Sequence, residues 1–265
     1  MDVETEQPGR AEKPPGNAER QPGSFGNQQA ETGENRKSAW RGAWPSDRGT
    51  GMAGIYGEYA DTLQKVMDQL IGELSDYNKV VKEKTRDGIY EHLLGRVKSE
   101  ESMREKCDRR GVPQTPESAL RVMTDSIGLR VITRFIDDIY QIVTFLRKLP
   151  GVTIVQEKDY IRHAKPNGYR SYHVILDREV PYPDIDGRQP GHYYIEVQLR
   201  TIAMDSWASL EHQLKYKKDI GNEELIVKEL KRCADELAGC DLSMQTIRNM
   251  IREEENGDED TACRG

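Results

Sequence analysis

The large aliphatic residues that build a protein core are almost absent from the first 54 residues of this chain. Residues 1–54 contain no Ile or Leu and a single Val, against five Pro and nine Gly. A segment of this composition cannot bury enough apolar surface to offset the conformational entropy lost on folding. We therefore expect residues 1–54 to form a disordered N-terminal tail, and any core to come from later residues.

Charge is also distributed unevenly along the 265 residues. Residues 252–265 hold six acids and two Arg, and we expect them to form an acidic C-terminal tail with a net charge of −4. The first 54 residues carry −1, so −2 of the total of −7 remains for residues 55–251, the expected folded domain. This near-neutral balance leaves a nucleic-acid partner undecided, because only local clusters of charge could indicate one.

Several classes of protein are excluded by absent signals. No segment approaches the ~18 uncharged apolar residues of a membrane-spanning helix, and the N-terminus lacks the basic start and apolar run of a secretory signal. We therefore expect a cytoplasmic protein with no membrane partner. The sequence also lacks the glycine-rich loops of P-loop and Rossmann proteins, the Gly-x-Ser-x-Gly of serine hydrolases and any His-Asp dipeptide of metal-dependent hydrolases.

Apolar spacing predicts helices and strands that alternate within the expected domain. The predicted helices span residues 59–84, 99–110, 115–122, 137–147, 203–217 and 222–254, and the predicted strands span 127–134, 152–160, 170–177 and 193–201. Strands clustered between helices in this order indicate an α+β fold, with a mixed β-sheet and helices packed against it.

The strand at residues 193–200 alternates strictly between apolar and polar side chains. Its polar face carries Tyr194, Glu196, Gln198 and Arg200. Spacing alone favours plain solvent exposure for this face, and the alternative is that it lines a site.

The segment Lys165-Pro-Asn-Gly-Tyr-Arg-Ser-Tyr-His173 joins a turn to the start of a strand. Lys165 and Arg170 could hold phosphate, Tyr169 could stack on a base, and His173 could bond a phosphate oxygen. A hairpin corner whose rings cover the edge of the sheet is the equally weighted alternative.

A third group of polar residues begins at Gly95-Arg-Val-Lys98. Lys98, Ser102 and Lys106 follow at four-residue spacing, so one face of a short helix would present cations and a hydroxyl to a triphosphate. A solvated helix face is the more common outcome of such spacing. Asp125 precedes the apolar strand that carries Arg130, and a single acid in such a place is commonly a turn residue.

Together these segments resemble the synthetase domain of RelA/SpoT homologues. The resemblance rests on residues 125–130, 165–173, 195–201, 203–208 and 211–217. Their order, with Gly95-Arg-Val-Lys98 upstream, is similar to that of the stand-alone small alarmone synthetases of the RelQ type. The similarity extends over about residues 59–250 and implies a nucleotidyltransferase-like synthetase domain.

The resemblance implies a GTP pyrophosphokinase. Such an enzyme transfers the β,γ-pyrophosphate of ATP to the 3′-hydroxyl of GDP or GTP, which yields AMP and (p)ppGpp, the alarmone of the stringent response. The reaction needs Mg²⁺ to neutralise the phosphates and a group that takes the hydroxyl proton.

Roles for single residues also follow from the resemblance. Asp125 and Glu196 would hold Mg²⁺, and Glu196 would also take the proton of the 3′-hydroxyl. ATP would be bound by Arg96, Lys98, Ser102, Lys106, Arg130 and Lys158, with Arg96 and Arg130 on either side of the adenine. GDP or GTP would be bound by Lys165, Tyr169, His173, Gln198 and Asp205, with Tyr169 stacked on the guanine. Asp205 stands where the small synthetases have Asn, and its carboxylate could accept both hydrogen bonds that guanine offers.

Two other functions stay open beside alarmone synthesis. The toxic branch of the same family pyrophosphorylates the 3′-CCA end of tRNA or makes adenosine alarmones, and a regulatory or RNA-binding module could occupy an inactive synthetase fold. The acid pair Asp125 and Glu196 is intact, which argues against an inactive fold. The family resemblance implies a homo-oligomer, specifically a tetramer.

Overall fold

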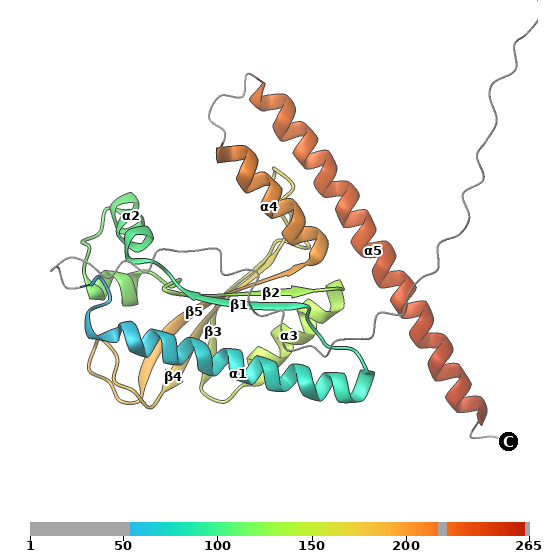
Figure 1. Cartoon of the computed structure of the whole chain (residues 1–265), viewed down its shortest axis with the longest axis horizontal. Coiled ribbons are helices and arrows are strands. Elements are labelled where there is room, and N and C mark those ends of the chain that lie inside the picture. The colour runs from blue at the N-terminus through green and yellow to red at the C-terminus, as the bar shows by residue number, and fades with distance from the viewer. Residues whose placement is uncertain (1–53, 217–221, 263–265) are drawn as a thin grey trace, which may run out of the picture. The chain divides into compact units, whose positions relative to one another are not determined.

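A five-stranded sheet with helices on both faces forms the described part of the chain (Figure 1). The computed structural model describes residues 54–216 and 222–262. The predicted N-terminal tail lies outside the described residues up to position 53, so its disorder stays a prediction. Among the described residues, no helix is long and apolar enough to cross a membrane.

The sheet is mixed, as the sequence predicts. Its strands are β1 (His92–Val97), β2 (Ile127–Thr133), β3 (Val152–Asp159), β4 (Tyr172–Val180) and β5 (Gly191–Thr201). Their order across the sheet is β1-β2-β5-β4-β3. β2 and β5 run parallel, and the other three neighbouring pairs run antiparallel. The expected α+β fold with a mixed sheet is therefore confirmed.

Strand β1 is the element that the apolar pattern does not predict. It is a six-residue edge strand that contains Gly95 and Arg96. Neither residue has the β-branched or aromatic side chain that marks a strand, so only the pairing with β2 identifies it.

Helices α1 (Ala60–Thr85) and α3 (Ile136–Lys148) cover one face of the sheet (Figure 1). Leu63, Val66, Leu70 and Leu74 of α1 are almost fully buried there, and each such side chain stabilises the fold by about 1.5–3 kcal/mol. A Cβ at Gly95 would lie 2.6 Å from Cδ1 of Ile71. Glycine therefore allows β1 to approach α1 closely.

Helix α2 (Glu100–Arg110) begins and ends where its capping residues predict. The Ser99 hydroxyl accepts a hydrogen bond from the Ser102 N–H, and Gly111 ends the helix in the left-handed conformation. The next short helix begins at a similar cap, because the Thr115 hydroxyl accepts a hydrogen bond from the Ser118 N–H. It closes as a π-helical turn, η2 (Ser118–Val122).

Helices α4 (Ile202–Tyr216) and α5 (Glu223–Ala262) complete the fold, with α4 on the face opposite α1 (Figure 1). The Trp207 indole donates to the Leu230 carbonyl oxygen at 2.8 Å and ties α4 to α5. The Thr201 hydroxyl donates to Asp241 at 2.6 Å and ties the end of β5 to the same helix. α5 continues to Ala262, beyond the predicted end near Glu254.

Candidate active site

The sheet face opposite α1 carries the polar side chains that the sequence singles out. One row of paired residues crosses four strands: Lys158 of β3, His173 of β4, Gln198 of β5 and Arg130 of β2. The next row places Glu196 of β5 beside Gly128 of β2, which in turn pairs with Arg96 of β1. Because paired residues share a face of a sheet, these polar side chains gather on one face, where Glu196 and Gln198 of β5 are half-buried and Arg200 is buried.

Asp125, directly before β2, is held by two lysines. Its Oδ2 is 2.6 Å from Nζ of Lys106 on α2 and also contacts Nζ of Lys98 at the end of β1. Burial would raise the pKa of Asp125, but the hydrogen bonds from Lys106 and Lys98 outweigh it and lower the pKa. The sequence suggested these lysines for phosphate, whereas in the structure they neutralise the acid. Ser102 of the same group bonds Ser99.

Glu196 has a polar neighbour at each of its two carboxylate oxygens. Gln198 Nε2 donates to Oε2 at 3.0 Å, and His173 Nδ1 lies 3.7 Å from Oε1. Burial would raise the pKa of Glu196, but the contact with His173 and the hydrogen bond from Gln198 lower it. The negative charge of Asp125 raises the pKa of Glu196, so the two acids are close enough to repel each other.

The acids offer a partial metal site. Oδ1 of Asp125 is buried without a hydrogen-bond partner, so one carboxylate oxygen is available for a cation. No group of three or more His, Cys, Asp or Glu in the described part of the chain could hold a metal. Mg²⁺ is commonly bound by one or two carboxylates together with substrate phosphates, and Asp125 with Glu196 fits that donor set.

Arg96 and Arg130 lie diagonally across β1 and β2 on this face. Diagonal neighbours on adjacent strands are about 7–8 Å apart. That spacing admits one planar ring with about 3.5 Å on either side. Burial and then the nearby charge of Arg200 lower the pKa of Arg130, and Arg96 acts in the same direction.

The connection from β3 to β4 carries an aromatic cluster, Tyr160 and Tyr169, whose rings contact each other and His173 of β4. Gly168 has φ +91°, and a Cβ there would lie 2.6 Å from Cβ of Ala234 on α5, so the turn requires glycine. Tyr169 follows, and its hydroxyl is 2.8 Å from Nε2 of His173. Lys165 Nζ lies 4.7 Å from the ring centroids of both Tyr169 and Tyr160. Tyr160 belongs to this aromatic cluster, although no sequence pattern singles it out.

Asp205, at the start of α4, is bonded to Arg200. The Arg200 guanidinium donates to Oδ1 of Asp205 at 2.9 Å, and Arg130 lies 3.6 Å from the same oxygen. The same guanidinium donates to the Tyr169 hydroxyl at 3.0 Å. The alternating pattern of β5 places Arg200 on the face of Glu196 and Gln198, and this shared face is the only sequence signal that singles it out. Lys158 is exposed on the edge strand, in the row of His173.

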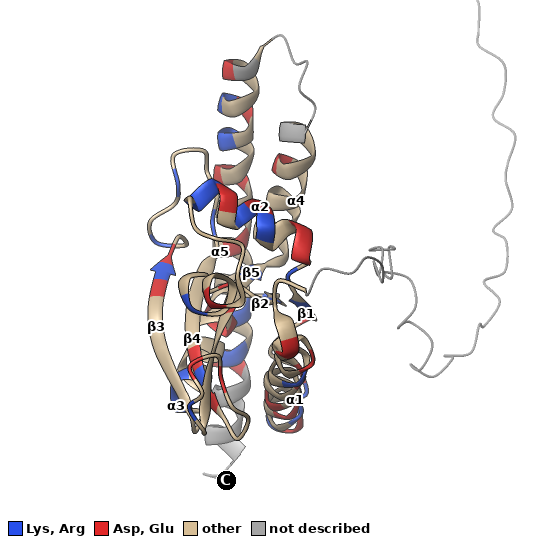
Figure 2. Ribbon diagram, turned by 90° about the vertical axis from the view of Figure 1, so that its left-hand side faces the viewer, with Lys and Arg blue, Asp and Glu red and all other residues tan. Residues whose placement is uncertain are grey.

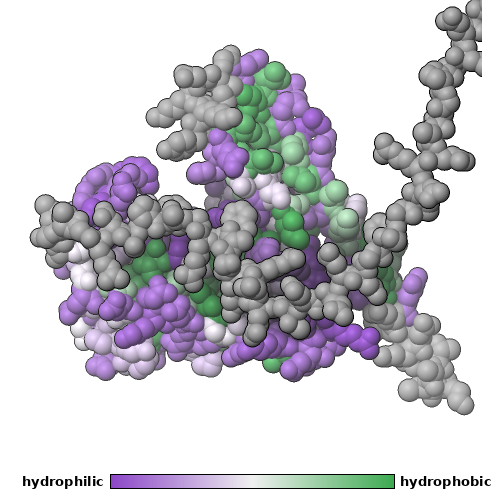
Figure 3. Space-filling view, viewed as in Figure 1, coloured by the Kyte–Doolittle hydropathy of each residue, from purple (hydrophilic) through white to green (hydrophobic). Residues whose placement is uncertain are grey.

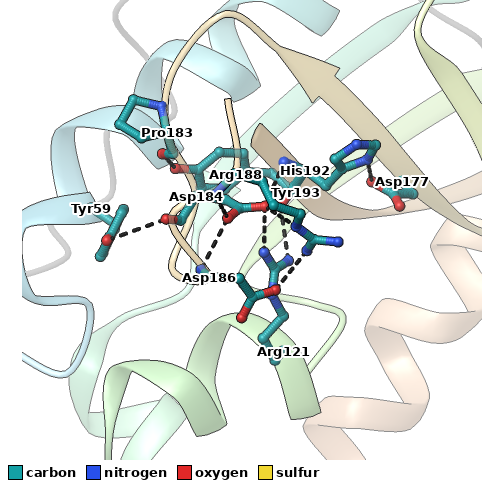
Figure 4. Close-up of polar contacts among 9 residues, drawn as sticks. All are labelled: Tyr59, Arg121, Asp177, Pro183, Asp184, Asp186, Arg188, His192 and Tyr193. Carbon is teal, nitrogen blue, oxygen red and sulfur yellow. Dashed lines mark hydrogen bonds and ion pairs between the residues drawn. The ribbon is translucent and has the colours of Figure 1, made fainter. Parts of the chain in front are cut away.

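A second polar cluster joins η2, which precedes Asp125 in the chain, to the connection between β4 and β5. Arg121 of η2 contacts Asp184 at 2.5 Å and Asp186 at 2.7 Å in the connection between β4 and β5, as Figure 4 shows. Asp184 also accepts from the backbone N–H groups of Arg188 and His192. Burial would raise its pKa, but these bonds and Arg121 lower it to about 2.

Comparison with known proteins identifies the family. The model described as "Region found in RelA / SpoT proteins" matches residues 95–221. GTP pyrophosphokinase YwaC of Bacillus subtilis (strain 168) is 38% identical over 161 residues, which cover 61% of this chain and 75% of that protein. The chain belongs to the RelA/SpoT family. GTP pyrophosphokinase YjbM of the same strain is 34% identical over 163 residues, with 62% and 74% covered.

Solved structures of small alarmone synthetases share the fold. The structure of small alarmone synthetase 1 from Bacillus subtilis bound to its product pppGpp has a TM-score of 0.62 at 30% identity, and covers 71% of this chain and 94% of its own. Small alarmone synthetase 2 from the same organism has a TM-score of 0.60 at 35% identity, with 71% and 96% covered. The predicted resemblance to RelA/SpoT small synthetases is therefore confirmed.

Proposed function

We propose that this chain is a (p)ppGpp synthetase, which transfers the β,γ-pyrophosphate of ATP to the 3′-hydroxyl of GDP or GTP. The observation that carries the proposal is the place of Asp125 and Glu196. Glu196 shares a sheet face with Arg96 and Arg130 and lies 3.7 Å from His173, which contacts Tyr169, and the charge of Asp125 acts on Glu196. Two relatives are named GTP pyrophosphokinases, and a related structure is bound to pppGpp, which supports the same reaction.

ATP would lie over β1 and β2. Adenine would stack between Arg96 and Arg130, whose planar guanidiniums Lys could not replace. Lys98 and Lys106 would release Asp125 and bind the phosphates, because an ATP triphosphate carries more negative charge than one carboxylate. Ser102 of α2 and Lys158 of β3 would bind further phosphate oxygens. Figure 2 shows basic and acidic residues interspersed on α2, so only its site-facing cations would serve this role.

The acceptor nucleotide would bind at the aromatic cluster of Tyr160 and Tyr169. Tyr169 would stack on guanine, while Lys165 and His173 would bind its 5′-phosphates. Asp205 would accept hydrogen bonds from N1–H and the 2-amino group of guanine, which adenine lacks. Gln198 would contact the acceptor nucleotide from the sheet, beside Glu196.

Asp125 and Glu196 would hold Mg²⁺ together with the substrate phosphates. The ion, when bound, supplies charge neutralisation at the transferred group. Glu196 would take the proton of the 3′-hydroxyl, since its carboxylate is ionised at neutral pH and accepts hydrogen bonds. Arg96, Arg130, Lys98 and Lys106 would hold the departing AMP and the transferred pyrophosphate by charge.

The acceptor distinguishes this function from the toxic branch of the family. The purified chain would be incubated with Mg²⁺ and β,γ-labelled ATP, and separately with GDP, GTP, AMP and bulk tRNA. We expect label on GDP and GTP, and none on AMP or tRNA. Label on tRNA alone would contradict alarmone synthesis and favour the toxic function.

We also propose that the chain forms a homo-oligomer, a tetramer by resemblance. Large apolar side chains of α5 are more than half exposed in the single chain: Leu242, Met244, Ile247, Met250 and Ile251. Figure 3 shows hydrophobic residues gathered along α4 and α5. Such a stripe would be buried against a second copy of the chain. Light scattering should give a multiple of the 30.3 kDa chain mass, and a monomer would contradict the proposal.

A further inference from the structure

Five side chains of the site form a closed ring of contacts. Tyr169 contacts His173 at 2.8 Å, His173 lies 3.7 Å from Glu196, and Gln198 donates to Glu196 at 3.0 Å. Arg200 closes the ring, because its Nη2 atom donates both to Gln198 Oε1 at 3.2 Å and to the Tyr169 hydroxyl at 3.0 Å. The ring links Tyr169 of the aromatic cluster to Glu196, the acid that would take the hydroxyl proton.

Arg200 fixes the direction of the hydrogen bonds that Tyr169 and Gln198 make in this ring. A guanidinium only donates, so the Tyr169 oxygen accepts from Arg200 and its single hydrogen is left for Nε2 of His173. A neutral His173 then carries its hydrogen on Nδ1, the atom that faces Glu196.

The same guanidinium also orients Gln198. Because Arg200 donates to Oε1, the amide group Nε2 faces Glu196. A reversed amide would place its hydrogens against the guanidinium and its oxygen against the carboxylate, which are two repulsive contacts. Arg200 therefore directs donors from both His173 and Gln198 toward the carboxylate.

Arg200 is built to stay in one orientation. It is 6% exposed, and its other terminal nitrogen donates to Asp205 at 2.9 Å. The guanidinium carbon lies 5.4 Å from the ring centroid of Tyr169, so it also limits where that ring can turn. A Lys at this position has one nitrogen and could not reach Asp205, Gln198 and the Tyr169 hydroxyl together.

We infer that Arg200 is a positioning residue for the transfer reaction, which sets the orientation of Tyr169 and Gln198 and so couples acceptor binding to Glu196. This inference rests on the proposed function. It differs from the roles assigned above because Arg200 acts through its neighbours and not on a substrate.

The first test compares Arg200→Lys with Arg178→Lys. Arg178 is a matched control, since it is also 6% exposed and hydrogen-bonded, but it lies on the opposite face of the sheet, where it contacts Glu73 and the Pro150 carbonyl oxygen. With Arg200→Lys we expect the KM for GDP to rise at least fivefold and kcat to fall at least tenfold, with the KM for ATP unchanged. Arg178→Lys should lower the melting temperature and leave all three constants within twofold. Unchanged GDP KM and kcat in Arg200→Lys would overturn the inference.

The second test is a double-mutant cycle with Tyr169→Phe, which keeps the ring and removes the hydroxyl that Arg200 bonds. Because both changes open the same ring of contacts, the double variant should lose little more kcat than the stronger single variant. Additive losses would show that Arg200 acts elsewhere and would overturn the inference.

Calorimetric binding of GDP, measured without ATP, separates the inference from the proposed function. If the wild type binds GDP but transfers nothing to it, the proposed function fails, and at least fivefold weaker GDP binding by Arg200→Lys still supports the role of Arg200. Equal GDP binding by wild type and Arg200→Lys would overturn that role whether or not transfer occurs.

Discussion

Lys106 Nζ lies 2.6 Å from Oδ2 of Asp125, and Lys98 contacts the same oxygen. Both ammonium groups are less than one fifth exposed, so this is a partly buried charge cluster at the edge of the site. In the nucleotide-free chain the acid and the lysines neutralise each other. An incoming triphosphate would compete for the lysines and leave the carboxylate free for a cation.

Replacing Lys106 by Met tests that exchange. A hydrogen bond from a charged donor to phosphate is worth about 1.5–3 kcal/mol, so the KM for ATP should rise about 10- to 150-fold while the KM for GDP is unchanged. Steady-state kinetics measure both constants. Lys79→Met is the control, since Lys79 is an exposed partner of Asp76 on α1 and should leave both KM values as they are. An unchanged ATP KM in Lys106→Met would remove Lys106 from the phosphate site.

Tyr169→Ala tests whether the guanine of the acceptor nucleotide stacks on the Tyr169 ring. Stacking of a base on an aromatic side chain is worth about 1–3 kcal/mol, so the KM for GDP should rise about 5- to 150-fold. Tyr77 provides a matched control, because it stacks on Phe145 at a centroid distance of 4.1 Å on the far face of the sheet. Tyr77→Ala should lower the melting temperature without changing the GDP KM. The assignment of Tyr169 fails if the two variants have the same GDP KM.

Gly168→Ala tests whether the contact with α5 sets the position of the loop between β3 and β4, which carries Tyr169. Alanine there is strained at φ +91°, and its Cβ would meet Ala234 at 2.6 Å. We expect the loop to shift, the GDP KM to rise several-fold and stability to fall by about 1–2 kcal/mol. Adding Ala234→Gly relieves the clash but not the backbone strain, so it should restore part of the loss. No recovery of GDP KM in the double variant would show that contact with α5 does not set the loop.

Asp184→Asn gives a prediction about pH. The pKa of Asp184 is lowered to about 2 from an ordinary value near 3.8, which corresponds to about 2 kcal/mol of stability at neutral pH. Because the folded pKa is the lower one, this stabilisation is complete above about pH 4 and is lost as the pH falls toward 2. Chemical denaturation should therefore give Asp184→Asn a free energy of unfolding about 2 kcal/mol below that of the wild type at pH 6. This difference should shrink below pH 4.

Asp186 is the control for this experiment. It contacts the same two arginines as Asp184 but is 46% exposed. Solvent screens the ion pairs of an exposed carboxylate. Asp186→Asn should therefore lower the free energy of unfolding by less than about 1 kcal/mol. A deficit in Asp184→Asn that stays constant from pH 6 to pH 3 would contradict the assigned charge state.

Much of the fold follows from apolar periodicity, because burial acts on every turn of a helix and every second residue of a strand. Periodicity thus locates α1, α3 and β5 within a few residues. It fails at β1, where the pairing partner and not the side chains decides the structure. The end of α5 is also beyond its reach, since the acidic segment after Glu254 carries no apolar pattern.

The candidate site is partly visible in the sequence for a related reason. The strand alternation puts Glu196 and Gln198 on one face, and the turn before His173 places Tyr169 near them. Contacts between distant segments have no such signature. The pairing of Lys106 with Asp125, the ring closed by Arg200 and the brace of Arg121 on Asp184 depend on how the loops meet over the sheet.

Identification of the products of ATP and GDP tests the central claim most directly. The wild-type chain would be incubated with Mg²⁺, ATP and GDP, and the nucleotides formed would be identified by phosphorus NMR. We predict equal amounts of AMP and of a guanosine nucleotide with a pyrophosphate on its 3′ oxygen, and neither product with 3′-deoxy-GDP or with Glu196→Gln. Formation of ADP in place of AMP, or full activity in Glu196→Gln, would contradict the account.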